Sequence, residues 1–216
     1  MPDAENFIDL PPLKTKRTMK TLFSLIIGCL LATSACVNAQ TSARPQSDNY
    51  INGVTALNEG NPERAYELLN AEITAHPDNG YAHCYMALVC NYYGDMKLAL
   101  DAVNNALRLL PESDSEYRSF AYYTRGSMLL NLKQWALADT DLSEAIRLNP
   151  QDTENYRARA EARLNNGDYE AALDDVTAAL KLDHKADVND LMLQLLAAAP
   201  SAELVDRIAS TYRMLE

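Results

Sequence analysis

Apolar and polar positions follow a helical period along most of this chain, and short polar breaks divide the pattern into paired segments. Residues 117–150 show it best, because one amphipathic run ends near Leu132 and a second closes at Pro150. Apolar residues that recur every three to four positions indicate helices with one buried face. The pattern predicts helices at residues 47–59, 62–75, 80–93, 96–110, 115–132, 135–148, 153–166 and 169–182.

The same two-helix design occurs four times. Its units begin near Gln46, Gly80, Ser119 and Thr153, so they are spaced 34, 39 and 34 residues apart. A period in the mid-thirties with two helices per unit indicates a helical solenoid. The extra residues before the third unit, around 112–116, predict either a longer loop or a longer helix.

Certain slots of each unit hold small residues, which lets the two helices of the unit approach closely. The slot on the first helix holds Gly53, Ala87, Gly126 and Ala160, and the slot on the second holds Ala65, Ala99, Ala138 and Ala172. A further slot holds Glu72, Ala106, Ala145 and Ala179, and the closing proline is Pro77, Pro111 or Pro150. The turn that ends the first helix is Gly60-Asn61, Gly94-Asp95, Lys133-Gln134 and Gly167-Asp168. Asn49 in the aromatic slot and Glu72 in the further small slot suit a first unit that is terminal and partly exposed.

These slots resemble those of the tetratricopeptide repeat family over about residues 46–184. The resemblance implies an all-α, right-handed solenoid of about four helical hairpins, an array at residues 48–184 with units near 46–79, 80–113, 119–152 and 153–186. In this family the first helices line a concave groove that binds a protein or peptide. Carrying those positions over gives the expected groove residues Tyr50, Asn58, Tyr81, Leu88, Asn91, Tyr92, Phe120, Tyr123, Asn131, Arg157 and Asn165.

The asparagines of this set have two interpretations. An amide both donates and accepts hydrogen bonds, so Asn58, Asn131 and Asn165 could grip a peptide backbone. Asparagine also favours the end of a helix before a turn. One version of the family clamps a terminal carboxylate with lysines, but the corresponding slots here hold Tyr50 and Tyr123, so this chain is not expected to share that mode.

Residues 187–216 predict two more helices that cap the array, separated by Pro200 and with Ser201 as an N-cap. A degenerate fifth unit and a docking helix for a partner are the alternatives. The two apolar stripes comprise Val188, Leu191, Met192, Leu195, Leu196 and Ala199, and then Leu204, Val205, Ile208, Tyr212 and Leu215.

Residues 1–39 carry the features of a secretory signal. Basic residues precede an apolar run that is short for a membrane span, and an A-x-A-like end follows. Cleavage after Ala39 and lipidation at Cys36 are both open, and residues 1–18 would be an upstream extension if Met19 is the start. Residues 40–47 predict a polar linker. The protein is therefore expected to be exported, periplasmic or extracellular, or lipid-anchored to the envelope.

The charge and the polar residues of the chain make several classes of function unexpected. A net charge of −11 repels phosphate backbones, so nucleic acid is not an expected partner, and membrane contact is expected only through the signal or a lipid. The three histidines lie in different units and have no partner at metal-binding spacing, so neither a metal nor a cofactor is expected. No catalytic motif stands out, and the chain is not expected to be an enzyme.

Three groups of polar residues are interpreted as structural. The carboxylate pairs Asp139/Asp141 and Asp174/Asp175 are expected to be solvated surface, because neighbours on a helix face different ways. The second group is Arg157, Arg159 and Arg163, which predict ion pairs at the surface of their repeat. The third is Cys84 and Cys90, expected to be packed thiols because they are too far apart along one helix for a disulfide.

The sequence thus predicts a scaffold or assembly factor of a bacterial envelope that binds a protein or peptide. An accessory protein that binds carbohydrate or cell wall is one alternative, with tyrosines stacking on sugars. A targeting subunit of an enzyme complex is another. The oligomeric state is left open.

Overall fold

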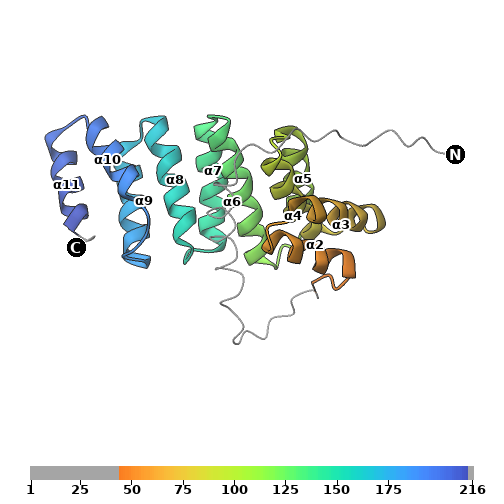
Figure 1. Ribbon diagram of the computed structural model, residues 1–216. Helices are drawn as coiled ribbons and strands as arrows, with labels where there is room; N and C mark the ends of the chain where they lie inside the picture. The colour runs from red at the N-terminus through yellow and green to blue at the C-terminus, as the bar shows by residue number, and fades with distance from the viewer. Residues whose placement is uncertain (1–43, 214–216) are drawn as a thin grey trace. The chain divides into compact units, whose positions relative to one another are not determined.

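The computed structural model describes residues 44–213, and this range holds ten helices and no strand. In chain order they are α2 (Asp48–Asn58), α3 (Pro62–Ala75), α4 (Gly80–Tyr92), α5 (Met96–Leu109), α6 (Ser115–Asn131), α7 (Trp135–Leu148), α8 (Thr153–Asn166), α9 (Tyr169–Leu182), α10 (Asn189–Ala198) and α11 (Ala202–Tyr212) (Figure 1). The eight repeat helices end within one residue of the expected positions, and the all-α fold class is confirmed.

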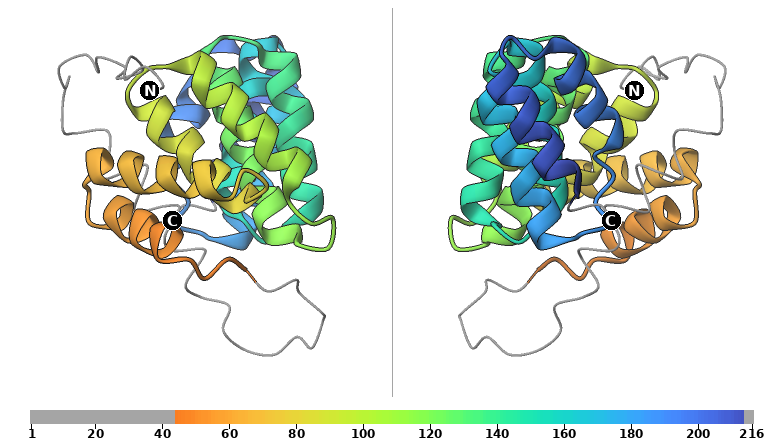
Figure 2. Two further views of the ribbon diagram at one scale, coloured as in Figure 1. Left: turned by 90° about the vertical axis from the view of Figure 1, so that its right-hand side faces the viewer. Right: turned by 90° about the vertical axis from the view of Figure 1, so that its left-hand side faces the viewer.

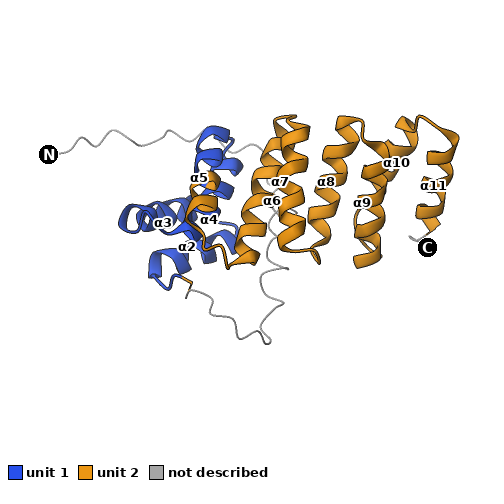
Figure 3. Ribbon diagram, turned by 180° about the vertical axis from the view of Figure 1, so that it is seen from behind, with its two compact units in different colours: residues 1–40, 45–102 blue, residues 41–44, 103–216 orange. Residues whose placement is uncertain are grey.

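The described residues form two compact units, and the division falls within α5 (Figure 3). The N-terminal unit comprises residues 45–102, where α3 packs against α2 and α4. The C-terminal unit comprises Arg44 and residues 103–213. There α6 to α9 pack as successive hairpins, α8 also contacts α6, and α10 packs against α8, α9 and α11 (Figure 2).

Polar N-cap residues set most helix starts. The side chains of these residues accept a hydrogen bond from a backbone N–H two or three positions further on, which satisfies a donor that the first turn leaves unpaired. They are Ser47, Asn61, Asn79, Asp114, Asp152 and Ser201. The expected break at Pro200 and cap at Ser201 are confirmed.

Left-handed residues make the turns within the hairpins. Gly60, Gly94 and Gly167 have φ of 74°, 79° and 88°. In the third repeat the same turn uses Lys133 at φ 58°, so a residue with a Cβ takes a conformation that favours glycine.

The slots that hold small residues lie where the two helices of a unit contact each other. The four alanines of the second-helix slot are fully buried. A Cβ added to Gly126 would lie 2.8 Å from Leu142 Cγ, and one added to Gly53 would lie 2.9 Å from Leu69 Cγ. The expected close approach of the paired helices is therefore confirmed.

The residues inserted before the third unit lengthen a helix. The helix α6 has 17 residues where α8 has 14, and its extra first turn starts after the N-cap Asp114. Arg44 forms an ion pair with Glu116 on this turn. Its Nε lies 3.6 Å from Asp114 Oδ2, and its Cζ lies 4.6 Å from the centre of the Tyr117 ring.

Glu72, whose charge suggested a partly exposed first unit, does not itself lie at an exposed position. Its side chain is buried, with 1% of the residue exposed. It accepts hydrogen bonds from Ser47 Oγ at 2.6 Å and from Asn79 Nδ2 at 2.8 Å. Since Ser47 and Asn79 cap α2 and α4, the carboxylate lies near two helix N-termini, whose dipoles favour a negative charge.

The C-terminal helix pair covers the apolar core of the last repeat and leaves some of its own apolar residues exposed. Met192, Leu195, Leu204 and Ile208 join the core that α8 and α9 begin. Other members of the predicted stripes are exposed, namely Leu196, Val205 and Tyr212. The two helices thus pack on the last repeat as the expected cap does, and Leu215 lies outside the described residues.

Candidate functional site

The expected groove residues of the N-terminal unit lie in different environments. Tyr50 and Tyr81 are 7% and 6% exposed, and their rings meet edge to face with centres 6.5 Å apart. Both rings therefore serve mainly as core. Leu88, Asn91 and Tyr92 are partly exposed, while Asn58 is exposed as the last residue of α2.

The expected residues of the C-terminal unit include a set that the structure brings together. Phe120, Tyr123 and Arg157 are all partly exposed, the first two on α6 and the third on the neighbouring α8. Asn131 and Asn165 are exposed near the ends of these helices. We call the surface formed by Phe120, Tyr123, Ser127, Glu154, Arg157 and Glu161 the α6–α8 face.

Tyr123 is the centre of the α6–α8 face. Its ring packs against the core around Leu130 and Ala158, and its phenol lies beside the Ser127 side chain. Burial raises the pKa of Tyr123, the negative charge of Glu154 raises it further, and Arg157 lowers it. The phenol therefore stays a neutral hydrogen-bonding group at physiological pH, surrounded by charges from α8.

Arg157 supplies the positive charge of the face. Its Nε donates to Glu154 Oε2 at 2.8 Å, one helical turn earlier. Burial works against the charged guanidinium, but the charges of Glu154 and Glu161 raise the pKa of Arg157 overall. Since Glu154 already binds this guanidinium, Arg157 does not offer an isolated cation to a ligand.

Asn165 favours the helix-end interpretation of the recurring asparagines. Its Nδ2 donates to the backbone oxygen of Glu161 at 2.8 Å, within its own helix. The side chain thus bonds to the backbone of its own helix near the C-terminal end. Asn58 and Asn131 are the last residues of α2 and α6.

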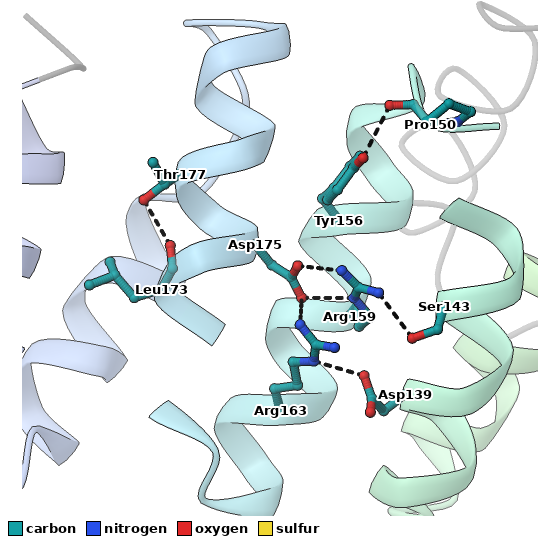
Figure 4. A network of polar contacts seen from close by, with 9 residues as sticks. All are labelled: Asp139, Ser143, Pro150, Tyr156, Arg159, Arg163, Leu173, Asp175 and Thr177. Carbon is teal, nitrogen blue, oxygen red and sulfur yellow. Dashed lines mark hydrogen bonds and ion pairs between the residues drawn. The ribbon is translucent and has the colours of Figure 1, made fainter. Parts of the chain in front are cut away.

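A buried ion-pair network joins α7, α8 and α9 (Figure 4). Arg159 donates twice to the carboxylate of Asp175, at 2.7 and 2.9 Å, and Arg163 donates to the same carboxylate at 2.9 Å. Arg163 also donates to Asp139 at 2.8 Å, and Arg159 to Ser143 Oγ at 3.0 Å. The expected ion pairs within the repeat are present, and the pair of Arg163 with Asp139 also joins this repeat to the preceding one.

The same arrangement occurs one repeat earlier. Arg125 on α6 donates twice to Asp141 on α7, both at 2.7 Å, and once to Asn104 on α5 at 2.8 Å. The hydrogen bond to Asp141 raises the pKa of Arg125. Asp141 and Asp175 are 5% and 3% exposed, so the expectation that they are solvated surface is wrong.

The repeat spacing itself could have identified this network. Arg125 and Arg159 are 34 residues apart, as are Asp141 and Asp175, and this is also the spacing of the third and fourth units. Charged residues that recur at one slot of successive repeats indicate a shared contact. The expectation of solvated aspartates used only their spacing along one helix, so it missed their recurrence at the repeat period.

The other candidate features are metal sites, cysteine thiols, membrane-spanning helices and the signal segment. Within residues 44–213 no group of three or more His, Cys, Asp or Glu side chains could hold a metal ion. Cys84 and Cys90 are buried thiols, as expected, and burial raises the pKa of Cys90 to about 11. No helix in this range is long and apolar enough to cross a membrane. The expected signal at 1–39, with Cys36, lies outside the described residues.

Comparison with known proteins identifies the class of fold. No protein-family model matches the chain. Solved structures show a likeness along most of it, and several are tetratricopeptide repeat proteins by description. The chain therefore has the tetratricopeptide repeat fold, which confirms the resemblance inferred from its small-residue slots.

Three structural neighbours are YrrB, MamA of Desulfovibrio magneticus, and PilF of Pseudomonas aeruginosa. The MamA structure has a TM-score of 0.64 at 20% identity and covers 79% of this chain and 97% of its own. YrrB, described as a tetratricopeptide repeat protein with an unusual peptide-binding site, has a TM-score of 0.56 at 21% identity, with coverages of 76% and 92%. PilF has a TM-score of 0.62 at 20% identity, with coverages of 77% and 73%.

Two curated proteins are similar in sequence. A tetratricopeptide repeat-containing thioredoxin of Arabidopsis thaliana is 26% identical over 117 residues, which is 54% of this chain. Protein FlbA of Caulobacter vibrioides is 26% identical over 164 residues, which is 76% of this chain. The chain spans 29% and 26% of the lengths of these two relatives.

Proposed function

We propose that this protein is a non-enzymatic scaffold that binds a segment of another protein through the α6–α8 face. The observation that carries the proposal is the position of Tyr123 between two first helices of successive repeats. Its phenol lies beside Ser127, Glu154 and Arg157, and Phe120 is on the same helix. Partly exposed aromatic rings with a polar tip supply contact area at a small loss of conformational entropy.

The comparisons support this proposal at the level of the fold. Stacked helical hairpins form extended surfaces that suit the binding of protein segments. The description of YrrB mentions a peptide-binding site, and that structure is similar to most of this chain. The carbohydrate alternative has less support, because it relied on several exposed rings and Tyr81 is 6% exposed.

The cell envelope is the proposed location. The support is the sequence pattern of residues 1–39, in which basic residues, an apolar run and small residues follow in the order of a secretory signal. Mass spectrometry of the mature N-terminus distinguishes the two processing sites, since cleavage after Ala39 leaves a plain Gln40 terminus and lipidation leaves a modified Cys36. A mature chain that starts before Met19 contradicts export by a cleaved signal.

A matched pair of variants tests the binding proposal. Ser127→Arg adds bulk and charge to the α6–α8 face without removing a core side chain, whereas Thr140→Arg adds the same group to an exposed position of α7. Affinity capture from envelope extract, read by quantitative mass spectrometry, should show partners that Ser127→Arg loses and Thr140→Arg keeps. Partners that both variants retain equally would place binding elsewhere.

A further inference from the structure

The charges of the α6–α8 face do not balance. The carboxylates of Glu154 and Glu161 interact with the single guanidinium of the face, that of Arg157. Asp152, at the edge of the face, and Glu154 interact with the phenol of Tyr123. This corner of the unit is therefore negative when Arg157 is fully charged. The whole chain is also acidic, with a net charge of −11.

The three carboxylates differ in what they already bind. Glu154 accepts from Arg157, and Asp152 accepts from the backbone N–H of Glu154 as the N-cap of α8. Glu161 has no hydrogen bond or close ion pair through its carboxylate with any residue in 44–213, and only a longer-range attraction joins it to Arg157. It lies one turn after Arg157 on the same helix, so its carboxylate remains available to a second cation.

An apolar surface adjoins this negative corner. Phe120 meets the buried Tyr117 edge to face, with ring centres 6.4 Å apart, and is itself partly exposed. Tyr123, which packs beside Ala158 of α8, is likewise partly exposed. An apolar side chain of a partner fits against these rings, and a basic side chain a few residues away reaches Glu161.

We infer that the segment bound by the α6–α8 face carries a lysine or arginine close to an apolar side chain. This inference rests on the proposed function, because it assumes that the face binds a protein segment at all. An acidic segment fits poorly, since the one cation of the face is already paired with Glu154 and Glu161 repels a second carboxylate. The negative charge of the whole chain also steers basic partners toward it.

Selection from a random library of short peptides displayed on phage tests the inference with the full chain as bait. Peptides retained by the wild type should be enriched in Lys or Arg near an apolar residue. Selection on Glu161→Lys should lose that enrichment. The basic residue of a selected peptide should form a salt bridge with Glu161. Replacing that residue by Gln should therefore weaken binding to the wild type about fivefold. The same replacement should change little on Glu161→Gln.

Two controls separate failure of this inference from failure of the proposed function. Glu144→Gln removes a carboxylate of α7 that pairs with Arg147 at the surface, and it should leave the preference unchanged. If Ser127→Arg abolishes the binding of selected peptides but those peptides show no basic enrichment, the binding face stands and the charge inference is overturned. If no peptide depends on residue 127, the proposed function itself fails.

Discussion

Replacing Asp175 by asparagine should remove a large part of the stability of the C-terminal unit. Asp175 is 3% exposed and accepts three hydrogen bonds from two arginines, at 2.7 to 2.9 Å. Breaking a buried ion pair on one side costs about 3 to 5 kcal/mol, because a charge is left buried without its partner. The side chains of Arg159 and Arg163 keep 16% and 21% exposure, which places the effect at the lower end of that range.

The remaining contacts reduce the effect further. Arg163 keeps Asp139, Arg159 keeps Ser143, and the asparagine oxygen still accepts one hydrogen bond. We therefore expect Asp175→Asn to lower the free energy of unfolding by about 2 kcal/mol and Asp175→Ala by about 3 kcal/mol. For a chain of this size 2 kcal/mol corresponds to a fall in Tm of about 6 °C.

Urea denaturation followed by circular dichroism measures the loss, and hydrogen exchange locates it, because repeat arrays can unfold in parts. Exchange should increase first in α8 and α9. Asp174→Asn is the matched control, since its side chain is 68% exposed and pairs with Arg207 at the surface. That variant should change stability by less than about 0.5 kcal/mol. Equal effects of the two variants would refute the argument that burial gives the Asp175 network its importance.

Three further predictions concern packing, turn geometry and thiol reactivity. Gly126→Ala should lower stability by about 1 kcal/mol in the same urea assay, because overpacking against Leu142 outweighs the gain in helix propensity; unchanged or higher stability would contradict this. Lys133→Gly should raise stability by about 0.5 kcal/mol, because relief of the strained left-handed conformation outweighs the added entropy of the unfolded chain. Gly167→Ala should lower stability, because alanine would have to adopt the same left-handed conformation. A Lys133→Gly variant that is less stable than the wild type would refute the turn argument. The thiol of Cys90, with its pKa raised to about 11, should resist iodoacetamide at pH 8 and react after unfolding in urea; rapid labelling of the folded protein would contradict its burial.

The sequence was informative wherever one residue type answers a local requirement. Gly53 and Gly126 fill slots where helices touch, and glycines form three of the four hairpin turns. These requirements recur at the repeat period, so the hairpins and their boundaries could be predicted. Local pattern also identified Ser201 as an N-cap.

The sequence was uninformative wherever a contact joins distant elements. The charge of Glu72 suggested a partly exposed first unit, yet Ser47 and Asn79 bind this carboxylate from the caps of two other helices. Nothing in the neighbourhood of Glu72 along the chain shows that these caps meet. The exposed Val205 illustrates the reverse case, since an amphipathic stripe does not reveal how wide a face its neighbours cover.

The candidate site lies between these two cases. Repeat positions placed Tyr123 and Arg157 on adjacent first helices, and the arginine cluster predicted an ion pair for Arg157, which it makes with Glu154. They also gave Tyr50 a position in the groove although its ring is mostly buried. Which groove positions remain accessible depends on the packing of several helices, and this is not encoded in the spacing of one repeat.

Site-specific photo-cross-linking in intact cells tests the central claim most directly. A photoreactive amino acid at position 127 lies on the α6–α8 face, and the same group at position 140 lies on an exposed part of α7. The account predicts a cross-link to a protein partner from position 127, lost on competition with a selected basic peptide, and none to that partner from position 140. Cross-linking of the same partner from position 140 but not from position 127 would contradict it.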